Sequence, residues 1–587
     1  MLLKTGLRKQ PLPRLPRFYG QMTETAQALT ISGGSWLDIA ARRPILIILI
    51  VALCGWFSGV ILLPPTDRDE SRFAEASRQM VETGNYIDIR FGNTPRYNKP
   101  AGIYWLQAVS AQLWGPAFRS QIWVYRLPSL LGGLLSLVFL YLLARALAPP
   151  ATALLASLLL GTTLLLTIES TIATTDAALL ASVIAAQAVL MRTYLAARGR
   201  ARPSNVLIFC GWAAVGAGIL LKGPVILIVI AATAIALSLW DGDWRWLKGT
   251  RPFVGAALVL ALVTPWASAI AVASHGAFYQ QSLGHDFAAK IFGGEESHGA
   301  PPGYYMVLAN ITFWPATLLF VPAIAFAIRD RKDPAIRFLL AWSGAVWLLF
   351  ELVPTKLPHY ILPAYPALAL VAALWATGAH ADREERWPRL FRWLAALQFA
   401  IGLLVLTAAC VFLPNHLGGT TGPLLLGGTA TVIVAGCIAI VFLLRRRPVS
   451  AAGAGMISAL LFSMLLAWEI VPQLRAVWLS SRAAELVADK RGTLQGPVVL
   501  DGYVEPSLVF LLGSNTRIEM AGKAARAAEG GRLALVEKRV APEFLSELQR
   551  RGDSVVALGH VSGLDYSTGR EQYITLYRVA RTGAPKS

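Results

Sequence analysis

A small set of charged residues stands in polar segments between long apolar runs, and their side chains could handle a phosphate. Asp69 and Arg72 are three residues apart at the start of a predicted helix, so they face the same way. A carboxylate placed like this can act as a general base, and a neighbouring cation can hold a phosphate. Asp176, at the start of another predicted helix, is the second candidate carboxylate. The simpler alternative is that each aspartate only caps its helix.

Three lysines join this set because they interrupt connections that contain few other basic residues. Lys222 lies beside a glycine and a proline, Lys356 lies four residues before Tyr360, and Lys290 lies five residues after His285. Lysine is a point-charge partner for phosphate, so the three lysines are candidates for a phosphate-binding site. The alternative is that each lysine only extends along the membrane surface to reach the headgroups.

The segment 64–121 must position the first of these residues. Apolar residues at helical spacing predict a helix over 70–83 that lies in the membrane interface. Asp67 and Glu70 resemble a capping box at its start, and Gly84 is the expected C-cap.

A second helix is expected to start at Pro100 and to end near Gly115, with Asn98 or Lys99 at its cap. Lys99 would then stand at a helix N-terminus. Amide donors, the helix dipole and the ammonium group would converge there, which favours phosphate binding.

Most of the chain is predicted to lie in a membrane. Of its 587 residues, 55% are hydrophobic and 15% are charged, whereas soluble domains carry about 25% charged residues. A spanning helix needs about 20 apolar residues. Thirteen segments qualify, over approximately 44–63, 122–144, 151–169, 177–195, 205–221, 224–240, 252–273, 304–328, 336–353, 360–378, 393–413, 422–444 and 451–471.

The basic residues give these helices an orientation. Lysine and arginine gather in the even-numbered connections, which the positive-inside rule assigns to the cytoplasm. The same bias explains the net charge of +19, and attraction to anionic lipids is compatible with it. The basic residues are spread over many loops, so a nucleic-acid partner is not indicated.

Three parts follow from this orientation. Residues 1–43 are expected to form a basic cytoplasmic tail. Residues 44–473 form the membrane part, including the loop 64–121 on the periplasmic side, and residues 474–587 form a periplasmic domain. A small α/β domain is predicted there, with a helix from Ser480 to about Lys490 and strands near 497–502, 532–537, 553–559 and 572–579.

Cofactor binding has little support in the sequence. The four cysteines lie inside apolar runs and are expected to pack as small hydrophobic residues. His275, His285 and His298 share one connection, but their spacing matches no helical metal pair. A divalent metal therefore stays open as an alternative, and no other cofactor is indicated.

Four motifs resemble the bacterial aminoarabinose transferases, which are lipid-linked glycosyltransferases of the GT-C fold, a group that includes the protein O-mannosyltransferases. The resemblance covers about residues 40–380, and the motifs occur in the same order as in the family. They are Asp69-Glu70-Ser71-Arg72-Phe73-Ala74-Glu75 with Tyr97-Asn98-Lys99-Pro100, then Thr175-Asp176, Leu221-Lys222-Gly223-Pro224 and Lys356-Leu357-Pro358-His359-Tyr360-Ile361-Leu362-Pro363.

The resemblance implies an inverting transfer of a sugar from an undecaprenyl-phosphate donor to a phosphate of lipid A in the bacterial inner membrane. By motif, Asp69 matches the principal catalytic carboxylate, and Arg72 and Lys99 match its basic partners. Asp176 matches the second carboxylate. Lys222 and Tyr360 match positions around the donor phosphate, and His285 with Lys290 stands where the family carries a histidine and an arginine that belong to the same set.

Two positions depart from the family pattern. Asn98 stands where aminoarabinose transferases usually carry a glutamate, and Lys290 replaces an arginine. Alternatives therefore stay open: transfer of galacturonic acid or a neutral sugar to lipopolysaccharide, or mannosylation of protein. A lipid transporter is the non-enzymatic alternative, but transporters place their charges near the membrane midplane.

Overall fold

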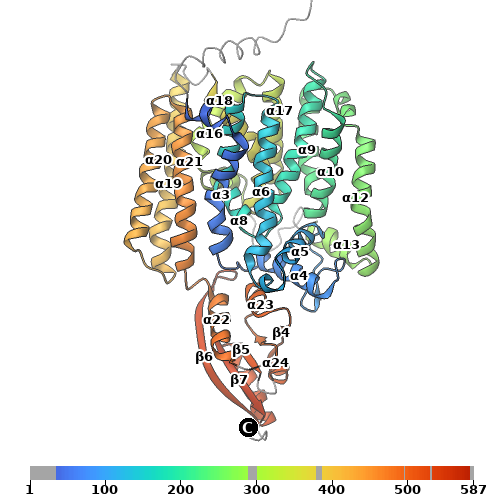
Figure 1. Ribbon diagram of the computed structural model, residues 1–587, viewed down its shortest axis with the longest axis vertical. Coiled ribbons are helices and arrows are strands. Elements are labelled where there is room, and N and C mark those ends of the chain that lie inside the picture. The colour runs from blue at the N-terminus through green and yellow to red at the C-terminus, as the bar shows by residue number, and fades with distance from the viewer. Residues whose placement is uncertain are drawn as a thin grey trace, which may run out of the picture.

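A computed structural model of the protein describes residues 35–287, 300–378, 386–492, 494, 496–528 and 532–581. Long helices lie side by side in one bundle, and a smaller domain that contains a sheet projects from one end of it (Figure 1). This arrangement confirms the predicted class of a polytopic helical membrane protein with a small C-terminal α/β domain.

The bundle is made by helices from the first two-thirds of the chain and by three later ones. In chain order these are α2 (Trp36–Ala40), α3 (Pro44–Leu62), α6 (Ile122–Ala144), α7 (Pro150–Gly161), α8 (Leu164–Thr171), α9 (Asp176–Ala196), α10 (Asn205–Lys222), α11 (Val225–Asp241), α12 (Pro252–Ala273), α15 (Tyr304–Thr312), α16 (Thr317–Arg329), α17 (Pro334–Leu352), η4 (Pro358–Ala364) with α18 (Tyr365–Thr377), α19 (Arg386–His416), α20 (Pro423–Leu444) and α21 (Pro448–Leu465).

All thirteen predicted segments are helical, but not all are single spans. Among the described residues, ten helices are long and apolar enough to cross a membrane, or eleven if the bent pair α7–α8 counts as one span. The other two predicted segments are α11, which has 17 residues, and the segment divided between α15 and α16. The predicted count of about thirteen therefore exceeds the count of full-length spans.

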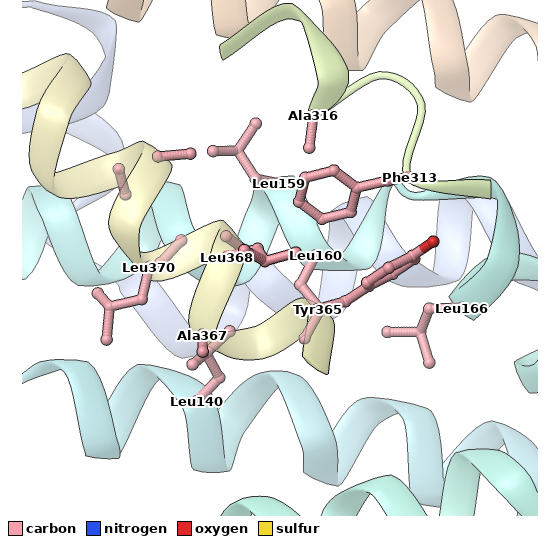
Figure 2. Close-up of a cluster of buried hydrophobic side chains, with 14 of the residues drawn as sticks. Leu140, Leu159, Leu160, Leu166, Phe313, Ala316, Tyr365, Ala367, Leu368 and Leu370 are labelled. Carbon is pink, nitrogen blue, oxygen red and sulfur yellow. The ribbon is translucent and has the colours of Figure 1, made fainter. Parts of the chain in front are cut away.

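Close packing of side chains from distant segments holds the bundle together. Figure 2 shows Leu160 from α7, Leu166 from α8 and Phe313 around Tyr365 of α18. The rings of Phe313 and Tyr365 are 4.6 Å apart, and the Tyr365 hydroxyl lies 2.6 Å from the hydroxyl of Thr312. Lipid is as apolar as these side chains, so tight packing rather than solvent exclusion stabilises such contacts.

A 65° bend between α7 and α8 shapes the end of the bundle that carries the C-terminal domain. The bend frees backbone groups, which must find other partners inside a membrane. Trp56 donates through its indole to the Gly161 carbonyl (3.1 Å), and the Leu164 amide donates to the Trp314 carbonyl (3.0 Å). These hydrogen bonds satisfy backbone groups at the bend, and α8 continues beyond it as a short helix that contains Glu169.

The predicted interfacial loop contains α4 (Asp69–Thr83), the hairpin β1 (Arg90–Phe91) and β2 (Thr94–Pro95), α5 (Gly102–Trp114) and the short turn η1 (Pro116–Phe118). Gly84 ends α4 in the left-handed conformation (φ 72°), as predicted. The predicted capping box is wrong, because Glu70 accepts from Thr66 and not from Asp67. The second helix begins at Gly102, so Lys99 precedes it instead of standing at its cap.

Glu70 and Arg126 form a buried ion pair that joins α3, α4 and α6. Arg126 donates to both carboxylate oxygens, at 2.7 and 3.0 Å, and also to the carbonyls of Leu63 (2.7 Å) and Pro64 (2.9 Å). The Ala173 amide donates to the same carboxylate at 2.9 Å. Burial would raise the pKa of Glu70, but Arg126 and these hydrogen bonds hold it below its usual value.

The C-terminal domain has a five-stranded sheet in the order β4-β3-β5-β7-β6. β3 pairs in parallel with β4 and β5, whereas β7 is antiparallel to β5 and β6. The four predicted strands and the first helix are present, and sequence reasoning missed β4 and three helices. The elements are α22 (Leu479–Arg491), β3 (Val499–Asp501), α23 (Pro506–Leu512), β4 (Arg517–Ile518), α24 (Ala521–Ala527), β5 (Leu533–Glu537), α25 (Ala541–Arg551), β6 (Asp553–Asp565) and β7 (Arg570–Arg581).

Candidate functional site

Asp176 and Lys222 form a buried ion pair at the end of the bundle nearest the C-terminal domain. Asp176 is the first residue of α9 and Lys222 is the last of α10, so the antiparallel packing of the two helices brings them together. The ammonium nitrogen lies 2.6 Å from Asp176 Oδ1, and the two side chains are only 10% and 9% exposed. Thr175 donates to the other carboxylate oxygen at 3.2 Å. The sequence suggested both residues, and the structure pairs them.

The motif around Tyr360 contributes one wall of the same site. The ammonium nitrogen of Lys222 lies 5.5 Å from the centre of the Tyr360 ring, within range of a cation–π interaction. The ring of His359 meets that of Tyr360 edge-on, with 5.0 Å between centroids. Both residues belong to η4, which the prolines at either end of the turn hold outside the regular helix α18.

Glu169 is a functional candidate that sequence reasoning missed. It lies in α8, and its Oε1 is 3.9 Å from Nδ1 of His359. Thr174 donates to the other oxygen at 2.9 Å. The side chain is 7% exposed and interacts electrostatically with Asp176 and Lys222. An acidic residue near the end of an apolar segment was the available signal, because such residues are rare in membrane helices.

Asp69 approaches this buried group from the loop. It is the first residue of α4, and its side chain is 67% exposed. Arg68 rather than Asp69 is the N-cap of α4, so the capping alternative does not account for Asp69. Asp69 and Lys99 both interact electrostatically with His359, as do Asp176 and Lys222. The loop and the bundle thus bring one exposed carboxylate, one buried ion pair and one further cation together.

Arg96, which the sequence did not single out, holds Asp69 in place. Its guanidinium lies 3.6 Å from Asp69 Oδ1 and donates to the Tyr104 hydroxyl at 3.0 Å. It also stacks over the Phe73 ring, 5.1 Å from the centroid. Arg96 lies on the strand side of the loop, where no helical spacing pointed to it.

Close packing keeps this loop against the bundle. A Cβ atom on Gly102, at the start of α5, would lie 2.6 Å from the carbonyl oxygen of Leu220. Real side chains do not tolerate that distance, so glycine is what lets α5 contact the last turn of α10. That turn ends at Lys222, so the contact fixes the loop next to the ion pair.

Other predicted residues lie elsewhere. The ammonium group of Lys356 donates to the carbonyls of Glu351 (2.8 Å) and Val353 (2.9 Å), which end α17. These are the contacts of a helix C-cap, so we do not place Lys356 in the site. Arg72 interacts electrostatically with Glu505 of the C-terminal domain.

Part of the histidine-containing connection, 274–303, lies outside the residues that the structure describes. Lys290 and His298 lie outside the described residues, as does the side chain of His285. Within the described ranges, no group of three or more His, Cys, Asp or Glu residues is arranged to hold a metal.

Comparison with known proteins agrees with the motifs. Residues 98–268 match the family model described as dolichyl-phosphate-mannose-protein mannosyltransferase. Over 309 residues, 52% of its length, the chain is 29% identical to an undecaprenyl phosphate-alpha-4-amino-4-deoxy-L-arabinose arabinosyl transferase of Pseudomonas paraeruginosa. Over 315 residues it is 30% identical to the Erwinia tasmaniensis protein of the same name. Each match spans 54% of the relative, so the chain aligns with about half the length of these curated relatives.

The fold comparison extends further along the chain. The crystal structure of ArnT from Cupriavidus metallidurans bound to undecaprenyl phosphate superposes with a TM-score of 0.72 at 18% identity, covering 91% of this chain and 97% of that one. The apo structure of the same protein gives a TM-score of 0.67 at 20% identity. The predicted resemblance is therefore confirmed: the chain has the GT-C fold of the aminoarabinose transferases over most of its length, and similarity to their sequences over about half of it.

Proposed function

We propose that this protein is an inverting glycosyltransferase that moves a sugar from an undecaprenyl-phosphate donor to lipid A or another part of lipopolysaccharide. The observation that carries the proposal is the buried Asp176–Lys222 pair beside Tyr360, with the exposed Asp69 close enough to interact electrostatically with the neighbouring His359. The relatives of similar sequence are named as arabinosyl transferases for an undecaprenyl-phosphate-linked sugar, which supports the proposed donor and the transfer of a sugar.

The site has the groups that such a reaction needs. A departing lipid phosphate gains negative charge, and Lys222 and Lys99 are the cations that would stabilise it. Asp69 would orient the acceptor and take its proton as the new bond forms at the anomeric carbon. A hydroxyl acceptor needs this base, whereas a phosphate acceptor is already ionised at neutral pH and needs it less. Holding two lipids at one membrane surface restricts their orientation, which also favours reaction.

The orientation of the protein follows from its charges. Arg198, Asp241 and Arg337 form ion pairs that tie three connections together at the end opposite the C-terminal domain. These connections are among the basic ones, which the positive-inside rule assigns to the cytoplasm. We therefore propose a cytoplasmic tail up to residue 43, a membrane part over 44–473, and a site and C-terminal domain (474–587) in the periplasm.

Removing the positive charge of Lys222 is expected to weaken catalysis strongly. Lys222→Met should lower kcat/KM for the donor by roughly 10²–10³-fold, the usual loss when one group that stabilises developing charge is removed. Lys222→Arg should retain part of the activity. Purified protein in detergent with radiolabelled donor gives the measurement. Lys248→Met, an exposed lysine beyond α11, is the matched control and should leave kcat/KM unchanged. Equal activity of the two methionine variants would exclude Lys222 from the site.

Mass spectrometry of lipid A and core oligosaccharide tests the proposed function in cells. Cells that lack this gene should lose one added sugar, and the wild-type gene should restore it. A missing amino-pentose would identify aminoarabinose as the sugar. A missing hexuronic acid, which would suit Asn98 and Lys290, or a missing hexose would identify another donor. Unchanged lipopolysaccharide would contradict the proposed acceptor.

A further inference from the structure

The C-terminal domain holds the turn that leads into Asp69. The backbone amide of Asp67 donates to the hydroxyl of Tyr566 at 2.6 Å, and Ser507 donates to the Asp67 carboxylate. The guanidinium of Arg68 donates to the carbonyl of Ser567. Two consecutive residues before Asp69 are therefore bound to a domain more than 400 residues away in the sequence.

The backbone of this turn is unusual. Arg68 has φ 62° and ψ −116°, a backbone conformation that residues other than glycine rarely adopt. Such a residue persists only where the surroundings fix its conformation. Arg68 is also the N-cap of α4, so its conformation sets the direction in which Asp69 leaves the turn.

The C-terminal domain also contacts α4 further along the helix. Arg78 donates to the carbonyl of Phe510 at 2.8 Å and lies over its ring, 5.0 Å from the centroid. Phe510 is fully buried among residues of the loop and the bundle, and its ring meets that of Tyr125 edge-on. In Figure 1, α23 lies directly beyond α4 at the end of the bundle. The C-terminal domain thus contacts α4 both at its start and in its middle.

We propose that Ser507 and Tyr566 are positioning residues for Asp69, acting through Asp67. They hold the strained turn at Arg68, and that turn aims the Asp69 carboxylate at the acceptor. This inference rests on the proposed function, because it assigns Asp69 a role in sugar transfer. It adds a role for the C-terminal domain that attachment of the loop does not require, since Arg126 already anchors the loop to the bundle.

The charge around Asp67 gives the contact a pH dependence. Burial, with repulsion from Glu505 and Asp565, raises the pKa of Asp67 to about 7, and burial and Asp565 raise the pKa of Glu505. Arg68 and Arg72 partly offset the charge on Glu505. Because the pKa of Asp67 is raised, the contact of Asp67 with Ser507 and Tyr566 is fully stabilising below the ordinary pKa of an aspartate. This contact weakens as pH rises through about 7.

Kinetics of the full chain test this proposal. The double variant Ser507→Ala/Tyr566→Phe should lower kcat by about 10–100-fold while KM for the donor changes less than twofold, because misplacement of about 1 Å can cost 10²-fold. Ser546→Ala/Tyr573→Phe makes the same chemical changes elsewhere in the domain and should leave both constants unchanged. In wild-type protein kcat should fall above about pH 7, and Asp67→Asn should remove that fall. Unchanged kcat in the first double variant would overturn the proposal.

Hydrogen exchange separates failure of this inference from failure of the proposed function. Amides of residues 66–72 should exchange at least tenfold faster in Ser507→Ala/Tyr566→Phe than in the wild type, whatever the substrate is. If the wild type transfers no sugar but exchange rises, the turn is held as inferred and the proposed reaction is wrong. If exchange is unchanged, Ser507 and Tyr566 do not hold the turn, and the inference is overturned.

Discussion

Replacing Asp69 with asparagine is expected to lower kcat for sugar transfer by roughly 10²–10⁴-fold, the range that a general base contributes. Asparagine keeps the size of the side chain, of which one oxygen lies 3.6 Å from the Arg96 guanidinium in the wild type. It removes the charge and the ability to take a proton. Because the Asp69 side chain is exposed and Arg68 rather than Asp69 is the N-cap of α4, the variant should fold normally.

Comparing two acceptors separates the two proposed roles of Asp69, which are to orient the acceptor and to take its proton. With a hydroxyl acceptor the loss should lie near the upper end of the range, whereas with a phosphate acceptor it should be smaller, since that group is already ionised. Asp38→Asn, an exposed aspartate in α2, is the matched control and should have wild-type kcat. Near-normal turnover of Asp69→Asn with both acceptors would exclude a catalytic role.

Replacing Arg126 with methionine is expected to have the largest effect on stability. Arg126 is fully buried and bonds the Glu70 carboxylate as well as the carbonyls that end α3. Its loss leaves a buried carboxylate without its cation, which costs about 3–5 kcal/mol. Thermal unfolding in detergent, followed by intrinsic fluorescence, should show a much lower Tm.

Two further variants isolate the ion pair. Arg145→Met, at the exposed other end of α6, should change the free energy of unfolding by no more than about 0.5 kcal/mol. Arg126→Met/Glu70→Gln should be more stable than Arg126→Met alone, because no charge then remains buried. If Arg126→Met is as stable as Arg145→Met, the pair does not fasten the loop to the bundle.

The helices could be predicted well from the sequence because a run of about 20 apolar residues is long enough to cross a membrane as a helix. Each of the thirteen predicted segments is helical, and the residues of the Asp176–Lys222 pair were both singled out. What it could not reveal was distance between segments. The pairing depends on α9 and α10 meeting at one end of the bundle.

The errors have a similar cause. Glu169 was hidden in a segment taken as one span, because the bend at Thr162 and Thr163 depends on partners from α3 and the segment near Trp314. Lys356 looked like a ligand from its neighbours, but its ammonium group caps α17. Arg126 drew no attention at a helix start, although it organises the loop. Local patterns identify elements, whereas these roles depend on long-range contacts.

Reconstitution with defined donors tests the central claim most directly. Purified protein in proteoliposomes would receive lipid A and one undecaprenyl-phosphate sugar at a time: an amino-pentose, a hexuronic acid or a neutral hexose. Mass spectrometry and NMR of the product would identify the added sugar and its anomeric configuration. The proposed function predicts that one donor yields modified lipid A with inverted configuration, and that Asp69→Asn and Lys222→Met abolish most of this product. Transfer that persists in both variants, or that retains configuration, would contradict it.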